Sequence, residues 1–225
     1  GQISHTEGNS TIASAQSSHA EGEHTIASSR ASHAEGYETT ASGNHSHAEG
    51  YNTTASGVNS HAEGESTTAS GWNSHAEGLD TTASGESSHA EGYNTIASGL
   101  RSHAEGWNTK ATGNFSHVEG RWNIEDTSNT YVHIVGNGNN KDDCKNAHTL
   151  DWSGNAWFAK DVYVGSTSGT NKDGGSKKLA TEDQVTAVTV GGVKRLCPYV
   201  VGADTAGRVE DYFSAKIIEN ESGKC

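Results

Sequence analysis

The residues best able to do chemistry in this chain are histidines and glutamates that recur in pairs. The string Ser-His-x-Glu-Gly occurs nine times between Ser4 and Gly120, at a strict spacing of 14 residues. The seven central pairs are His19 and Glu21, His33 and Glu35, His47 and Glu49, His61 and Glu63, His75 and Glu77, His89 and Glu91, and His103 and Glu105. Two further pairs, His5 with Glu7 and His117 with Glu119, flank them.

An imidazole two residues from a carboxylate suits three kinds of chemistry. The two groups can hydrogen-bond to each other in a ladder that joins neighbouring chains. They can ligate a metal ion, but one His and one Glu per repeat would need three chains to complete each ligand set. They can also exchange protons in catalysis, although nine identical pairs do not resemble one tuned active site. The ladder is favoured, so we expect no metal, no cofactor and no enzymatic activity.

The repeat that carries these pairs predicts an all-β solenoid. Each 14-residue unit has two halves, such as Ser60–Gly64 and Thr67–Gly71, and Ala and Gly recur every seven residues. Frequent Gly, Ser and Thr exclude a coiled coil, because these residues are poor in helix interiors. Alternation within Ser-His-Ala-Glu-Gly instead has the period of a strand, with Ser and Ala on one face and His and Glu on the other. Gly with the two variable residues after it predicts a corner.

Stacking of such units predicts a thin roll that needs partner chains. The inward positions carry only Ser, Ala, Thr and Gly, so one roll buries little apolar surface. The His and Glu positions do not vary among the nine copies. The equivalent position of the other half does vary, through Ile12, Ile26, Thr40, Thr54, Thr68, Thr82, Ile96 and Lys110. We therefore place the His and Glu strand at the interface between chains.

The corners carry large side chains that are candidate receptor contacts. These residues are Tyr37, Tyr51, Trp72, Tyr93, Trp107 and Phe115. Aromatic residues exposed on a rigid rod can contact glycans or proteins. The alternative is that they stack on one another and close the corners.

Composition excludes several partners. The 225 residues carry a formal net charge of −13, which disfavours nucleic acid and anionic membrane surfaces. No stretch is apolar enough to predict a membrane span. The three cysteines, Cys144, Cys197 and Cys225, are far apart and odd in number, and do not support a disulfide framework.

Four segments are expected along the chain. Residues 1–122 form the β-roll head, 123–165 a β neck or cap, 166–190 a linker with a short helix near Thr181 and Gln184, and 191–225 a C-terminal segment of undetermined fold. In the neck we expect strands at 131–136, 148–152 and 156–164, with a core formed by Trp152, Trp157, Phe158 and Tyr163. His133 and Cys144 are interpreted as structural residues rather than ligands.

The half-repeat Ala-x-Gly-x-x-Ser/Thr-x-Ala-x-Gly resembles the head repeat of trimeric autotransporter adhesins of the YadA type. That resemblance implies a left-handed parallel β-roll that exists as a homotrimer. The sequence of Ser46–Gly57 is similar to a variant of this repeat in phage and prophage tail proteins of Gram-positive bacteria. Residues 146–159 and 161–165 also resemble segments of phage minor structural proteins.

Together these features predict a homotrimeric attachment protein of a phage or phage-like tail. The expected partners are sister chains, a host cell-surface glycan or protein, and other tail or fibre proteins, without nucleic acid or membrane insertion. The expected location is the virion or the cell surface. Alternatives are a bacterial surface adhesin of the autotransporter type, a purely architectural filament, and a glycan-degrading spike, which would need paired carboxylates in a cleft.

Overall fold

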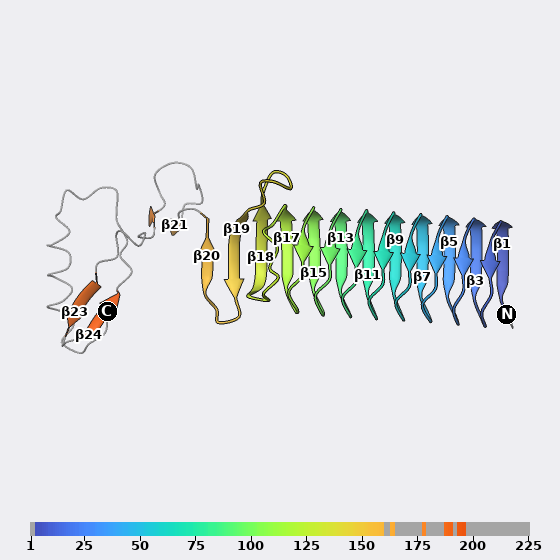
Figure 1. Cartoon of the computed structure of the whole chain (residues 1–225), viewed down its shortest axis with the longest axis horizontal. Helices are drawn as coiled ribbons and strands as arrows, with labels where there is room; N and C mark the ends of the chain where they lie inside the picture. The colour runs from blue at the N-terminus through green and yellow to red at the C-terminus, as the bar shows by residue number, and fades with distance from the viewer. Residues whose placement is uncertain (1–2, 160–162, 165–176, 179–186, 191–192, 197–225) are drawn as a thin grey trace. The chain divides into compact units, whose positions relative to one another are not determined.

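A computed structural model describes residues 3–159, 163–164, 177–178, 187–190 and 193–196. The chain divides into two compact units, residues 1–159 and 160–225. In the first unit, each of the first eight repeats forms one five-residue strand and one two-residue strand, and the ninth forms a five-residue strand only (Figure 1). The long strands are β1 (His5–Asn9), β3 (His19–Glu23), β5 (His33–Tyr37), β7 (His47–Tyr51), β9 (His61–Glu65), β11 (His75–Leu79), β13 (His89–Tyr93), β15 (His103–Trp107) and β17 (His117–Arg121). The short strands are β2 (Ile12–Ala13), β4 (Ile26–Ala27), β6 (Thr40–Ala41), β8 (Thr54–Ala55), β10 (Thr68–Ala69), β12 (Thr82–Ala83), β14 (Ile96–Ala97) and β16 (Lys110–Ala111).

Every strand pairs in parallel with its own copy in the next repeat. In the long-strand sheet His61 lies beside His75, and Glu63 beside Glu77. The short strands pair in the same way, as Thr68 with Thr82 shows. Each repeat is therefore one rung of a solenoid. The described residues contain no helix, and the predicted parallel β solenoid of 14-residue coils is confirmed.

Alanine forms the core between the two sheets. Fourteen alanines from Ala20 to Ala111 are fully buried, and the Ser and Thr residues beside them are buried as well. A methyl group is the largest apolar side chain found there until the short-strand sheet ends at β16. Beyond that strand the same column carries Val118 and then Ile134, both 1% exposed. Larger side chains occupy this column where the opposing sheet no longer limits the space.

Each corner that leads into a long strand is closed by the Ser of Ser-His-x-Glu-Gly. Its hydroxyl donates to the carbonyl three residues earlier, at 2.6 to 2.8 Å, as Ser74 does to Gly71. These hydroxyls are buried, so the bond also satisfies them. The Ser is thus a turn residue as well as a core residue.

Glycine has the positive φ that the sequence suggested at only one of the two corners of each coil. The residue in the left-handed region is the second variable one, at every seventh position from Ser10 to Trp122; Asn52 and Asn59 have φ of 53° and 56°. Asparagine tolerates this conformation better than most residues. Gly50, which ends a Ser-His-x-Glu-Gly string, also has a positive φ of 105°. Gly57 in the other half is required by close packing instead, since a Cβ there would overlap the Gly71 carbonyl.

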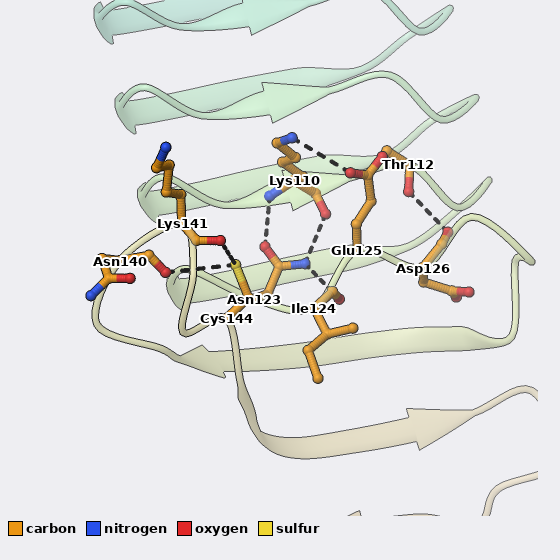
Figure 2. Close-up of polar contacts among 9 residues, drawn as sticks. All are labelled: Lys110, Thr112, Asn123, Ile124, Glu125, Asp126, Asn140, Lys141 and Cys144. Carbon is orange, nitrogen blue, oxygen red and sulfur yellow. Dashed lines mark hydrogen bonds and ion pairs between the residues drawn. The ribbon is translucent and has the colours of Figure 1, made fainter.

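At the C-terminal end of the roll, after β16, side chains make the hydrogen bonds that the backbone of another strand would make. The Asn123 amide accepts from the backbone N–H of Lys110 at 2.8 Å and donates to its carbonyl at 3.0 Å, so it satisfies the free edge of β16 (Figure 2). The Thr112 hydroxyl donates to the carbonyl of Asp126 at 2.9 Å. Cys144, in the same region, is a free thiol. The short-strand sheet therefore ends at this cap rather than at an open edge.

The long-strand sheet continues past the repeats. β18 (Tyr131–Asn137) pairs in parallel with β17. β19 (Asn146–Asp151) then pairs antiparallel with β18, and β20 (Ala156–Phe158) antiparallel with β19. Residues 152–155 form the hairpin turn between β19 and β20, where the Gly154 N–H donates to the Asp151 carbonyl at 3.1 Å. The predicted aromatic core is wrong: Trp152, Trp157 and Phe158 are all about half exposed, because the second sheet that would cover them ends at β16.

The second unit is described only in part. β21 (Tyr163–Val164) pairs with β22 (Lys177–Lys178), and β23 (Ala187–Val190) with β24 (Val193–Leu196), both antiparallel. The helix expected near 181–184, the Tyr163 side chain, and residues 197–225 of the C-terminal segment lie outside the described residues.

The alanine core predicts that a larger side chain is rejected in the middle of the roll. We expect Ala76→Ile to destabilise the protein by about 1–3 kcal/mol, because two sheets packed on methyl groups leave no room for three more carbons. The midpoint of urea unfolding measures this. Val118→Ile, in the same column beyond the last short strand, is the matched control and should change the midpoint little. An Ala76→Ile midpoint equal to that of the parent chain would contradict this packing.

Candidate functional site

The outward face of the long strands carries the His and Glu columns, and we call the nine pairs from His5 to Glu119 the His–Glu face. Alternation along each strand buries Ser and Ala and turns His and Glu outward. About a third of each side chain is exposed in the middle rungs; His75 and Glu63 are both at 34%. The structure thus brings all the predicted ladder residues onto one face, where a single chain leaves them uncovered.

The imidazoles form one continuous stack. From His19 to His117, neighbouring ring centroids are 4.7 to 4.9 Å apart and their planes lie within 3° to 7° of parallel. This spacing is that of neighbouring strands, so the backbone register imposes it. The stack continues to His133 in β18, at 5.3 Å and a tilt of 41°. His133 was interpreted from the sequence only as a lone structural residue.

Most imidazoles pair with the carboxylate of the preceding rung. From His47 to His117, the His Nε2 lies 3.0 to 3.6 Å from the Glu Oε1 twelve residues earlier, as in His103 with Glu91. His133 lies 3.3 Å from Glu119, fourteen residues earlier, and the Nε2 of His33 has no hydrogen-bond partner. His19 instead lies 3.7 Å from Glu21 in its own rung. The spacing of two residues in the motif suggests pairing within a rung, whereas most pairs join two rungs. The side-chain ladder therefore links rungs alongside the backbone bonds.

Neighbouring rungs also gather three possible metal ligands at four places, such as His61, Glu63 and His75, with ligand atoms within 4.8 Å of one another. The rings are nearly parallel, so their Nε2 lone pairs point in the same direction and do not converge. One ion cannot lie in both ring planes at once. We therefore interpret these groups as hydrogen-bonding partners, in line with the expectation from the sequence.

The carboxylate column has to share protons. Partial burial, followed by hydrogen bonds to Glu21 and Glu49, raises the pKa of Glu35 from 4.5 to about 7. For Glu49, burial acts upward, but hydrogen bonds from Glu35 and Glu63 outweigh it and lower its pKa. Burial, together with the neighbouring His47 and His19, lowers the pKa of His33. Like charges one strand apart explain this pattern, since a proton held by one carboxyl stabilises the next carboxylate.

The predicted receptor contacts divide between the two edges of the roll. Tyr37, Tyr51, Tyr93 and Trp107 each end a long strand, whereas Trp72 and Phe115 follow short strands. All six are between 36% and 64% exposed. Tyr37 and Tyr51 stack face to face at 5.2 Å, and the Arg101 guanidinium lies 5.5 Å from the Phe115 ring centroid. The alternative expected from the sequence, stacking along a corner, thus holds for the tyrosine pair.

Comparison with protein families identifies the repeat. Residues 48–74 and 76–102 match the YadA head domain repeat, in two copies. The match and the 14-residue coils confirm that the roll contains YadA-like head repeats. This is an adhesin-type repeat, which supports a role in attachment and is consistent with exposure at a cell surface.

Two other findings complete the comparison. No curated protein matches the chain. Among the described residues, no helix is long and apolar enough to cross a membrane.

Proton sharing in the carboxylate column predicts how the contribution of Glu35 to stability changes with pH. The folded chain holds a proton at Glu35 between pH 7 and 4.5 that the unfolded chain releases, so this group's contribution to stability rises as pH falls through 7. His33 opposes it below pH 6.5, because the unfolded chain protonates first there. Glu35→Gln imitates the protonated carboxyl. It should raise the melting temperature at pH 8, and the difference from the parent chain should shrink by pH 5.

Glu65→Gln, at an exposed corner outside the column, is the control and should show no such pH-dependent difference. A Glu35→Gln variant that melts below the parent chain at pH 8, or shows the same difference at pH 8 and pH 5, would contradict proton sharing.

Proposed function

We propose that this chain is a non-enzymatic attachment protein that acts as a homotrimer, in which sister chains pack through the His–Glu face. The observation that carries the proposal is the uninterrupted run of stacked His and Glu columns, two-thirds buried already in one chain. The equivalent outward position of the short strands tolerates Ile, Thr and Lys. A face that never varies among nine rungs is the one expected to meet a partner.

The size of the face suits an interface. Nine strands about 4.8 Å apart, each of five residues at about 3.3 Å, outline an area on the order of 700 Å². A standard protein interface buries about 800 Å² on each partner. Five of these pairs are hydrogen-bonded at 3.0 to 3.3 Å within one chain, whereas the Nε2 atoms of His19, His33 and His61 have no partner there and could bond to a sister chain. The number of copies, three, follows from the resemblance to YadA-type heads.

The proposed setting is a phage or phage-like tail appendage, where a rigid rod presents its exposed corners to a host surface. The similarity of residues 46–57, 146–159 and 161–165 to phage tail and minor structural proteins supports this setting. Partners would then include host-surface molecules and other tail or fibre proteins. The repeated pairs lie along a flat face rather than in one enclosed cleft, which supports a non-enzymatic role.

Assembly through the His–Glu face predicts that the chain sediments as a trimer. We expect His75→Ala to weaken the trimer, because it removes a ring stacked between His61 and His89 and the partner of Glu63 at 3.2 Å. Thr68→Ala on the short-strand face is the matched control and should leave the sedimenting mass unchanged. Sedimentation equilibrium at several concentrations measures both. A monomeric parent chain, or a trimer that Thr68→Ala weakens and His75→Ala does not, would contradict the proposed interface.

Attachment itself is tested on whole cells. Fluorescently labelled protein should bind bacterial cells from a panel of Gram-positive hosts, and it should release no soluble sugar from their walls. Binding to none of the panel would favour a purely architectural filament, and sugar release would contradict the non-enzymatic role.

A further inference from the structure

A short strip of aromatic rings lies at the edge of the roll where the long strands end. Tyr93 is the last residue of β13, Trp107 the last residue of β15, and Trp122 follows β17 directly. In Figure 1 the arrowheads of these strands line one edge of the sheet. Successive ring centroids are 6.5 Å apart, and we call these three residues the aromatic strip.

The rings of the strip are tilted, so that none lies flat on the next, and Trp122 is the most buried of the three. Tyr93 and Trp107 are inclined by 59°, and Trp107 and Trp122 by 60°. Tyr93 and Trp107 are 44% and 45% exposed. Tyr37 and Tyr51 differ, because their planes are only 4° apart and each ring covers a face of the other. The strip is thus the place where neighbouring aromatic rings offer faces to a ligand.

Two asparagine side chains lie beside the rings of the strip. Asn94 and Asn108 follow Tyr93 and Trp107, and the Asn94 amide donates to the Asn108 side-chain oxygen. Their backbone N–H groups donate to Leu79 and Tyr93 carbonyls at 2.8 and 2.9 Å, which fixes both residues in the left-handed conformation. The three rings and two amides carry no charge, and the one cation beside them, Arg121, lies in register with Trp107 and donates to the Asn139 side-chain oxygen at 3.2 Å.

The strip is too small to be a protein interface by itself. An aromatic side chain offers about 150–250 Å², so three rings less than half exposed offer on the order of 300 Å². A standard protein partner covers about 800 Å². Ring faces one rung apart, with amides beside them, instead suit a narrow extended ligand with apolar C–H faces and hydroxyl groups. That is the chemistry of a sugar chain.

We infer that the aromatic strip binds an uncharged glycan chain laid along the rod, with sugar rings stacked on Tyr93, Trp107 and Trp122. The Asn94 amide supplies hydrogen bonds to hydroxyl groups. The net charge of −13 disfavours anionic glycans, and the one neighbouring cation, Arg121, already donates to Asn139. This inference rests on the proposed attachment function and names the class of ligand that the rod would contact.

The test is binding of the full chain to an array of neutral and acidic oligosaccharides, followed by titration of the bound sugars by tryptophan fluorescence. We expect neutral glycans to bind, and Trp107→Ala to weaken binding about tenfold through loss of the central ring. Trp72→Ala, on the opposite edge, should bind like the parent chain. Both variants should keep the parent's sedimenting mass, since neither residue lies on the His–Glu face.

Several outcomes would overturn the inference. These are binding of acidic glycans alone, no glycan binding, equal affinity of Trp107→Ala and the parent chain, or loss of the oligomer in Trp107→Ala. The cell assay separates this failure from failure of the proposed function. If Trp107→Ala binds cells as well as the parent chain, attachment stands and the strip is not its site. If the parent chain binds no cells, the proposed function itself fails.

Discussion

In-register pairing of each rung with the next is the constraint on which the whole molecule depends. Because the repeat is 14 residues without insertion or deletion, every side chain in the roll has its own equivalent as a neighbour one strand away. Each column must therefore tolerate contact with itself. Alanine does so by filling a thin core, Ser by bonding back to its own corner, and His by stacking. Glutamate does not, since identical charges would repel at this distance.

The His column offsets the repulsion between neighbouring carboxylates in the Glu column. An imidazole lies 3.0 to 3.6 Å from the carboxylate of the rung before it, and a carboxyl such as Glu35 holds a proton near neutral pH. The hydrogen bond from the imidazole stabilises the carboxylate, and the proton on Glu35 removes one negative charge from the face. This explains why His and Glu recur together, and why neither is replaced in any of the nine copies. The face can then be polar, periodic and still suited to contact with sister chains.

Much of the fold could be predicted from the sequence, because the period and the residue types limit the architecture strongly. Strand pairing, the small-residue core and the outward His and Glu follow from Ser-His-x-Glu-Gly at a spacing of 14. The pairing of His103 with Glu91 rather than Glu105 does not follow, because it depends on how side chains lean along the stack. The cap was also missed, since an Asn such as Asn123 looks like any loop residue until its amide meets the backbone of Lys110.

The misjudged features share one physical reason. Trp152, Trp157 and Phe158 were expected to form a core because large apolar residues usually do, yet burial needs a second layer and the short-strand sheet ends at β16. Likewise, glycine has the expected positive φ at only one of the two corners, as at Gly50, whereas the second residue after each glycine, such as Asn52 or Asn59, has one at both. Local sequence indicates a turn, but the position of the next rung decides its geometry.

Deletion of rungs tests the stacking constraint most directly. Removal of residues 60–73 takes out one whole coil, and removal of residues 60–72 takes out one residue fewer. The 14-residue deletion should give the β-sheet circular dichroism and cooperative melting of the parent chain, since each remaining column stays in register. The 13-residue deletion should lose cooperative melting, because a slip of one residue turns buried alanines outward. Equal melting of the two deletions would contradict the account.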